Sequence, residues 1–137
     1  MGFFKKEDIE SFEIITLHLG GMRGLCEYEI VMKDGLAEVS FYDIRCSQEH
    51  DERILRERAT CDVARMLSLL NDCRVLSWDG FDGPHPKWVL DGTMFRFTAT
   101  VNGDRKIYAH GSENFPRHYH DFESGLREIL RNTEKTE

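Results

Sequence analysis

Two turn dipeptides constrain the fold of this chain more than any other feature. Asp34-Gly35 and Asn102-Gly103 each lie between segments in which apolar and polar residues alternate. Asp, Asn and Gly tolerate the positive φ angles that two-residue hairpin turns require. Because such turns join neighbouring antiparallel strands, we expect a largely antiparallel sheet.

The alternating segments predict six strands in two groups of three. The first group forms a meander, with a glycine-dense turn at residues 20–24 between its first two strands. Residues 74–77 are expected to form a short strand that leads into the second hairpin. The predicted strands are 9–19, 26–32, 36–44, 74–77, 93–101 and 105–110.

Two other segments have apolar residues at a spacing of three or four, which is typical of amphipathic helices. The first is 47–72, with Ser47 as its expected N-cap, and the second is 117–131. Gly125 lies inside the second segment and costs about 1 kcal/mol relative to alanine, so this helix needs tertiary packing. The stripe of the first helix comprises Leu55, Ala59, Val63, Met66, Leu67 and Leu70.

The order of these elements, βββαβββα, predicts an α+β fold of two layers, with both helices packed on one sheet of about six strands. A chain of 137 residues with 40% hydrophobic residues is the usual size and composition for one domain. We therefore expect a single domain over residues 1–137, with loose ends at 1–8 and 132–137.

The net charge of −7 narrows the range of partners. Nucleic-acid binding depends on Lys and Arg neutralising phosphates, so DNA, RNA and anionic membranes are not expected as partners. No apolar run reaches the length of a signal peptide or a membrane span, which favours a cytoplasmic protein. The widely spaced Cys26, Cys46, Cys61 and Cys73 are typical of free thiols in a reducing compartment.

Glycine, proline and aromatic residues are concentrated around Trp78-Asp79-Gly80-Phe81 and residues 89–95 and 111–116. In a structural interpretation, Trp78 and Phe81 close one end of the sheet, while Asp79 and Asp91 accept backbone hydrogen bonds in turns. In a functional interpretation, Trp78, Phe81 and Trp88 form the apolar wall of a ligand or partner site that the two aspartates anchor. Both interpretations remain open from the sequence.

These motifs carry a resemblance. Trp78-Asp79-Gly80-Phe81, Leu90-Asp91-Gly92, Gly111-Ser112 and Phe115-Pro116 resemble a pattern in a family of small, uncharacterised bacterial proteins. The similarity runs over most of residues 14–130, and this chain inserts residues 83–88 between the first two motifs. The resemblance implies no activity, because that family has no established biochemical role.

Histidine and serine residues supply the remaining candidates for chemistry. His110, His118 and His120 are weak metal-ligand candidates, because two histidines at i and i+2 cannot lie on the same helix face. Ser112 follows His110 by two residues, but no Gly-x-Ser-x-Gly elbow surrounds it, which favours a turn or capping role. No recurrent catalytic, phosphate-binding or metal motif is present, so neither a metal nor a cofactor is expected.

Two functional hypotheses follow. The first is a small acidic protein-interaction module, of an inhibitor or immunity type, that neutralises a basic partner. The second is a small-molecule binder or an enzyme, with a pocket between the Trp78 loop, the turn at 20–24 and the step at 111–116; His110 and Ser112 would lie nearby. The non-enzymatic interpretation is favoured, and pairing of an exposed sheet edge makes a homodimer a further prediction.

Overall fold

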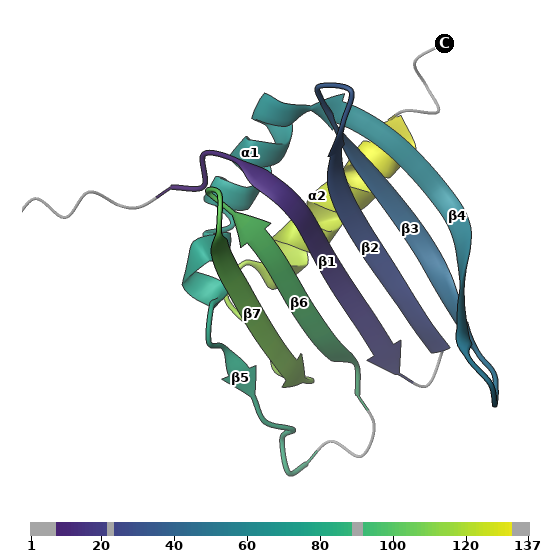
Figure 1. The fold of residues 1–137 in the computed structure, drawn as a ribbon. Coiled ribbons are helices and arrows are strands. Elements are labelled where there is room, and N and C mark those ends of the chain that lie inside the picture. The colour runs from purple at the N-terminus through teal and green to yellow at the C-terminus, as the bar shows by residue number, and fades with distance from the viewer. Residues whose placement is uncertain (1–7, 22–23, 89–91, 133–137) are drawn as a thin grey trace, which may run out of the picture.

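Two helices cover one face of a seven-stranded sheet and leave the other face open (Figure 1). The computed structural model describes residues 8–21, 24–88 and 92–132. The strand order is β4-β3-β2-β1-β6-β7-β5, and every neighbouring pair is antiparallel except β5 with β7. The predicted α+β class with a largely antiparallel sheet is therefore confirmed, with seven strands in place of six. The expected loose ends lie almost entirely outside the described residues.

The elements follow one another along the chain in the order given below. The four strands of the first half precede both helices, and a short 3-10 helix follows the first helix. The bounds are β1 Phe12–Gly21, β2 Gly24–Lys33, β3 Leu36–Cys46, β4 Asp51–Asp62, α1 Val63–Asp72, η1 Val75–Trp78, β5 Asp82–Gly83, β6 Met94–Val101, β7 Arg105–Ser112 and α2 Tyr119–Asn132.

Both predicted hairpin turns form. Asp34 and Gly35 have φ angles of 54° and 77°, and Asn102 and Gly103 have φ angles of 50° and 89°. Positive φ at both central residues is the geometry whose twist matches that of the flanking strands. Asn102 also accepts hydrogen bonds through Oδ1 from the backbone N–H groups of Glu10 and Ser11, which ties the second turn to the start of β1.

The predicted helix over 47–72 is wrong for its first half, because residues 51–62 form β4. Ala59 is the one buried residue of the strand 51–62, so the apolar residues spaced at three or four in this segment do not form a buried face. Cross-strand pairing with β3 decides the conformation and overrides the local spacing. The helix begins at Val63 after Asp62, and Ser47 is not its N-cap: the Ser47 hydroxyl donates to the His50 carbonyl oxygen over 2.5 Å in the β3–β4 turn.

The strand predicted over 74–77 is also wrong. Arg74 adopts a left-handed conformation with a φ angle of 53°, which ends α1, and the following residues form the 3-10 helix η1. This connection turns the chain back toward the sheet. The first half of the chain thus contains four strands and the second half three.

The core lies between the sheet and the helices. Alternate side chains of β1, such as Ile15 and Leu17, point toward the helices, while Thr16 and His18 point to the open face. In α2 the buried residues repeat at helical spacing. Gly125 allows α1 and α2 to approach closely, because a Cβ atom there would lie 2.5 Å from Cδ1 of Leu69. The glycine that lowers the helix propensity of α2 is thus also the residue that allows α1 to pack against this helix.

The long edge strand β4 carries features that oppose pairing with another chain. Its register with β3 shifts between Phe41 and Tyr42, where Arg56 is the extra residue. Bulges and charged side chains on an edge strand discourage edge-to-edge association. The homodimer stays a prediction, and this edge does not favour it.

Candidate functional site

A cavity of about 610 Å³ opens on the helix side of the sheet, at the end where β1 and β2 meet. Its size falls in the range of small-molecule sites, which is roughly 300 to 1,000 Å³. The wall comes from the β1–β2 hairpin, the start of β6, the segment after β7 and one face of α2. The lining residues are Leu19, Gly20, Gly21, Gly24, Cys26, Gly92, Thr93, Glu113, Phe115, Tyr119, His120, Glu123 and Arg127.

Aromatic rings form the apolar part of this cavity. Phe115 and Tyr119 are stacked with centroids 4.5 Å apart, and Phe95 packs behind Phe115 at 5.3 Å. Tyr119 is 2% exposed, so its ring is fixed by the core while Phe115 remains partly accessible. Phe115 therefore offers a flat apolar surface to a planar ligand, with Tyr119 packed against it.

Glu123 lies at the centre of the polar part of the cavity. The Tyr28 hydroxyl donates to Glu123 Oε2 over 3.5 Å, and Arg127 Nη2 lies 3.5 Å from the same oxygen. Burial, with the Glu123 charge as a smaller contribution, raises the pKa of Tyr28 above its ordinary value. The cavity therefore presents a partly buried carboxylate beside a neutral phenol.

Cys26 points into the cavity from β2 as a protonated thiol. Burial, followed by the charges of Glu123 and Asp43, raises the pKa of the Cys26 thiol, and Arg127 opposes this only in part. The thiolate is the nucleophilic form of cysteine, and reactive cysteines have lowered pKa values. The environment of Cys26 is therefore that of a structural thiol, which argues against nucleophilic catalysis at this position.

Glu113 forms the rim of the cavity in a strained backbone conformation, with a φ angle of 50°. Its backbone N–H donates to the Thr93 carbonyl oxygen over 2.8 Å, and the Thr93 N–H donates to Glu113 Oε2. Gly92 makes room for this arrangement, because a Cβ atom there would lie 2.8 Å from Oε2 of Glu113. Strained residues that are held by several contacts often occur at binding sites.

The Trp78-Asp79-Gly80-Phe81 motif forms a type II turn. Asp79 has φ −58° and ψ 128°, Gly80 has φ 83°, and the Phe81 N–H donates to the Trp78 carbonyl oxygen over 2.8 Å. Asp79 Oδ1 accepts a hydrogen bond from the backbone N–H of Tyr108, which extends the ladder of β7. This role for Asp79 agrees with the structural interpretation of the motif.

Trp78 is in the core, with 1% of its surface exposed. Its ring packs edge-on against Phe97 at 5.0 Å and Phe122 at 5.5 Å, and its Nε1–H donates to the Arg117 carbonyl oxygen over 3.0 Å. Trp78 therefore cannot contact a ligand while this core is intact. Neither Trp78, Trp88 nor His110 lines the cavity described above.

The structure separates the remaining predicted site residues. Phe81 is half-buried against Phe95, with ring centroids 6.1 Å apart, whereas Trp88 is 90% exposed. His110 and Ser112 lie on the open face of β7, and Asp91 lies outside the described residues. The predicted cluster is thus not one site, and the cavity borders the turn at 20–24 and the step at 111–116 with no residue of the Trp78 loop in its lining.

The three candidate metal ligands point to three different places. His110 Nε2 lies 3.7 Å from Asp82 Oδ1, and His118 Nδ1 lies 3.2 Å from Asp121 Oδ2 at the start of α2. His120 lines the cavity. Within residues 8–21, 24–88 and 92–132, no group of three or more His, Cys, Asp or Glu side chains could hold a metal ion.

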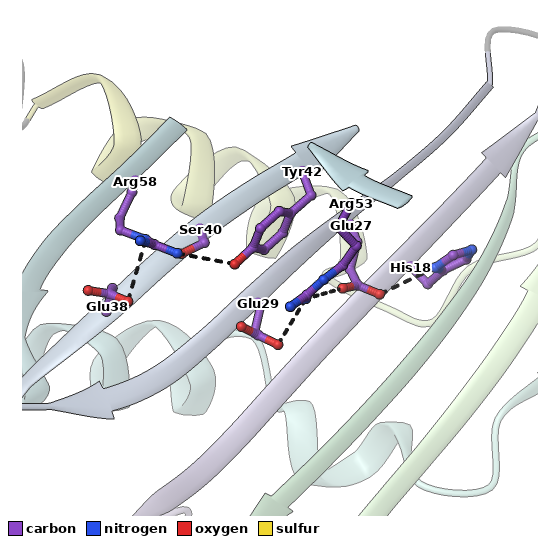
Figure 2. Close-up of polar contacts among 8 residues, drawn as sticks. All are labelled: His18, Glu27, Glu29, Glu38, Ser40, Tyr42, Arg53 and Arg58. Atoms are coloured by element: carbon purple, nitrogen blue, oxygen red, sulfur yellow. Dashed lines mark hydrogen bonds and ion pairs between the residues drawn. The ribbon is translucent and has the colours of Figure 1, made fainter. Parts of the chain in front are cut away.

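Figure 2 shows a second polar cluster, on the face of the sheet that the helices leave open. Arg53 Nη1 donates to Glu27 Oε2 over 2.9 Å and to Glu29 Oε2 over 3.2 Å, and its guanidinium lies 4.2 Å from the centroid of the Tyr42 ring. His18 Nδ1 lies 3.5 Å from the same Glu27 side chain. These contacts tie the edge strand β4 to β2 and β1.

Arg58, further along β4, also contacts polar side chains of β3 on this face. Its Nε donates to Ser40 Oγ over 2.9 Å, its Nη2 donates to Tyr42 Oη over 3.2 Å, and Glu38 Oε1 lies 3.5 Å away (Figure 2). Both arginines are thus already satisfied by groups of the sheet. This cluster accounts for the strand conformation of β4 and leaves few donors for a ligand.

Sequence reasoning did not identify the polar residues of the cavity. His120, Glu123 and Arg127 repeat at three and four residues and flank the apolar stripe of α2. That spacing places them on one side of the helix, which is a signal that a helical-wheel comparison could have found. Their approach to Cys26 depends on how α2 crosses the sheet, and the sequence does not specify that crossing.

No helix in the described part of the chain is both long and apolar enough to span a membrane. Comparisons of the chain with protein-family models, with curated proteins and with solved structures find no match. The resemblance to small bacterial proteins therefore stays a prediction that rests on its turn motifs.

A first testable prediction concerns alkaline pH. Burial, with smaller contributions from Asp121 and Asp72, raises the pKa of Cys73 to about 11, whereas an unfolded cysteine titrates near about 8.5. Above the lower value the unfolded chain loses a proton that the folded protein keeps, so the free energy of unfolding should fall as pH rises through this window. Tyr28 and Tyr119, whose pKa values are also raised by burial, act in the same direction at higher pH.

Urea unfolding measured at several pH values checks this expectation. The Cys73→Ala variant should show a shallower decline between about pH 9 and pH 11 than the unmodified protein. An equal decline in both proteins would mean that Cys73 titrates in the folded state as it does in the unfolded chain.

Proposed function

We propose that this protein is a non-enzymatic binder of a small planar molecule that carries a cationic or hydrogen-bond-donating group. The observation that carries the proposal is the cavity of about 610 Å³, in which an aromatic pair faces a partly buried carboxylate. A flat apolar body would stack on Phe115, and a donor group would reach Glu123 or Glu113. Only Arg127 among the charged lining residues opposes a cation, and it is paired with Glu123.

Two acidic groups among the described lining residues, the Cys26 thiol and the Tyr119 phenol, support binding over catalysis. The pKa of the Cys26 thiol is raised, and the phenol of Tyr119 is also held in its neutral form by burial. A nucleophile needs a lowered pKa or an adjacent base, and neither group has a lowered pKa. The polar groups of this cavity are suited to recognising a ligand.

Two matched probes test this proposal. Phenethylamine and phenylacetate share an aromatic ring and differ in the sign of their charge. Titrated into isotopically labelled protein and followed by NMR, phenethylamine should shift the amide resonances of Cys26 and Glu123 with a dissociation constant on the order of 1 mM. Phenylacetate should bind more weakly, because the carboxylates of the cavity repel it.

Glu123→Gln keeps the shape of the side chain and removes its charge. This variant should weaken phenethylamine binding by about tenfold and reduce the preference between the two probes. Glu128→Gln is the control, because Glu128 lies on the same helix and pairs with Arg65 outside the cavity. Equal loss of binding in both variants, or no saturable shift with either probe, would contradict the proposal.

A second candidate function is the protein-interaction module that the acidic composition favours. Its supporting observation is Trp88, which is 90% exposed. Aromatic side chains that are accessible in a free protein often anchor partner contacts. Affinity capture with the unmodified protein and with Trp88→Ala tests this candidate: an identified stoichiometric partner lost only in the variant would support it, and identical capture by both would contradict it.

A further inference from the structure

The open face of the sheet contains a hollow that is separate from the cavity proposed above as a ligand site. It lies over β5, β6 and β7, on the side of the sheet turned away from α2, and has a volume of about 360 Å³. Arg96, His110, Ser112 and Tyr108 line it from the two antiparallel strands, and His85 closes it from the loop after β5. All four polar strand residues point to the same face, because they alternate with buried positions.

Arg96 differs from the other arginines of this face. Arg53 contacts two carboxylates of β2, and Arg58 contacts one carboxylate of β3, as described above. The guanidinium of Arg96 makes no hydrogen bond or ion pair with any residue of the described ranges 8–21, 24–88 and 92–132, and the side chain is exposed. An accessible guanidinium with this freedom can bind an oxyanion through two parallel N–H donors.

The neighbours of Arg96 add further donors. The antiparallel register places His110 directly opposite Arg96 on β7 and His18 opposite it on β1. Side chains directly opposite one another in such a ladder have Cβ atoms roughly 5 Å apart. The Nε2 atom of His110 also lies 3.7 Å from a carboxylate oxygen of Asp82, and this carboxylate competes with an incoming anion.

Ser112 lies two residues beyond His110 on the same face of β7. Its Oγ is 2.7 Å from Nδ1 of His85. When Nδ1 carries the proton, it donates to the serine oxygen, and the serine O–H can then donate to a ligand. Arg96, His110 and Ser112 thus bring three kinds of donor to one hollow.

We propose that this hollow is an oxyanion site that binds a phosphorylated or carboxylated small molecule, with Arg96 as the principal contact and His110 and Ser112 as additional donors. The volume leaves room for the organic part of the ligand beside Met94 and Tyr108, which are 59% and 48% exposed. The site is distinct from the cavity beside α2, since the sheet lies between the two.

Inorganic phosphate and acetate are the probes that distinguish the two ligand chemistries. In an NMR titration at fixed ionic strength, phosphate is expected to shift the amide resonances of Arg96, His110 and Ser112 in a saturable manner, with a dissociation constant on the order of 1 mM. Acetate binding at the same residues with higher affinity would assign the site to carboxylates in place of phosphoryl groups.

Arg96→Gln should weaken binding of the preferred probe by about tenfold or more. Arg53→Gln is the matched control, because it removes a guanidinium from the same face of the sheet but outside the hollow. Unchanged binding in Arg96→Gln would overturn the proposal, as would equal weakening in both variants, which would indicate a general effect of charge. The lack of a saturable shift with either probe would also overturn it.

Discussion

Replacing Trp78 by alanine is expected to lower the free energy of unfolding by about 3 to 5 kcal/mol. The indole is 1% exposed and packs between Phe97, Phe122 and Tyr119, so its removal leaves a large void among rings held by other contacts. The Arg117 carbonyl oxygen also loses the Nε1–H donor. Because typical domains are stable by about 5 to 15 kcal/mol, this single change should remove a large part of the total stability.

Urea unfolding monitored by circular dichroism measures the effect, and Trp88→Ala provides the control. Trp88 is 90% exposed, so its removal should change the free energy of unfolding by no more than about 0.5 kcal/mol. The pair compares the same substitution in two environments. Similar losses in the two variants would contradict the assignment of Trp78 to the core and of Trp88 to the surface.

Gly111→Ala is expected to destabilise the protein by about 1 to 3 kcal/mol through overpacking. A Cβ atom at Gly111 would overlap the backbone carbonyl oxygen of Asn114 and would lie 2.8 Å from Cε1 of Phe95. A backbone atom cannot rotate away, so the chain after β7 would have to move. That movement should also displace Glu113 and Phe115, which form part of the cavity wall.

Gly21→Ala is the matched control for this prediction. A Cβ atom at Gly21 would lie 3.5 Å from the nearest atom, the Gly92 carbonyl oxygen, which is an ordinary van der Waals distance. Thermal unfolding of the two variants should therefore show a clear decrease in melting temperature for Gly111→Ala and little change for Gly21→Ala. The opposite order would contradict the packing described at the end of β7.

The hairpins and the final helix could be predicted because their signals are local. Asp34-Gly35 and Asn102-Gly103 fix turn geometry by themselves, and α2 has a clear apolar stripe. The strand β4 could not be recognised, because its conformation depends on pairing with β3 and on contacts with β2, which lie outside the segment itself. Arg53 pairs with Glu27 and Glu29 of β2, and no pattern within 51–62 reports those contacts.

In the candidate site, too, the features set by local turns could be predicted from the sequence, and the contacts between distant residues could not. The sequence predicted a pocket between the Trp78 loop, the turn at 20–24 and the step at 111–116, whereas the cavity borders only the turn and the step. It assigned Trp78 to either the core or a binding wall, and burial in the structure agrees with the core. Glu123 was not singled out, because its contact with Tyr28 joins residues 95 positions apart.

The most direct test of the cavity as a ligand site is a measurement of intermolecular nuclear Overhauser effects between phenethylamine and the protein. The account predicts contacts from the probe's ring protons to Phe115 and Tyr119, which form the stacked pair in the cavity. Contacts confined to Tyr108 and Met94 on the open face, or no contacts at a saturating probe concentration, would contradict it.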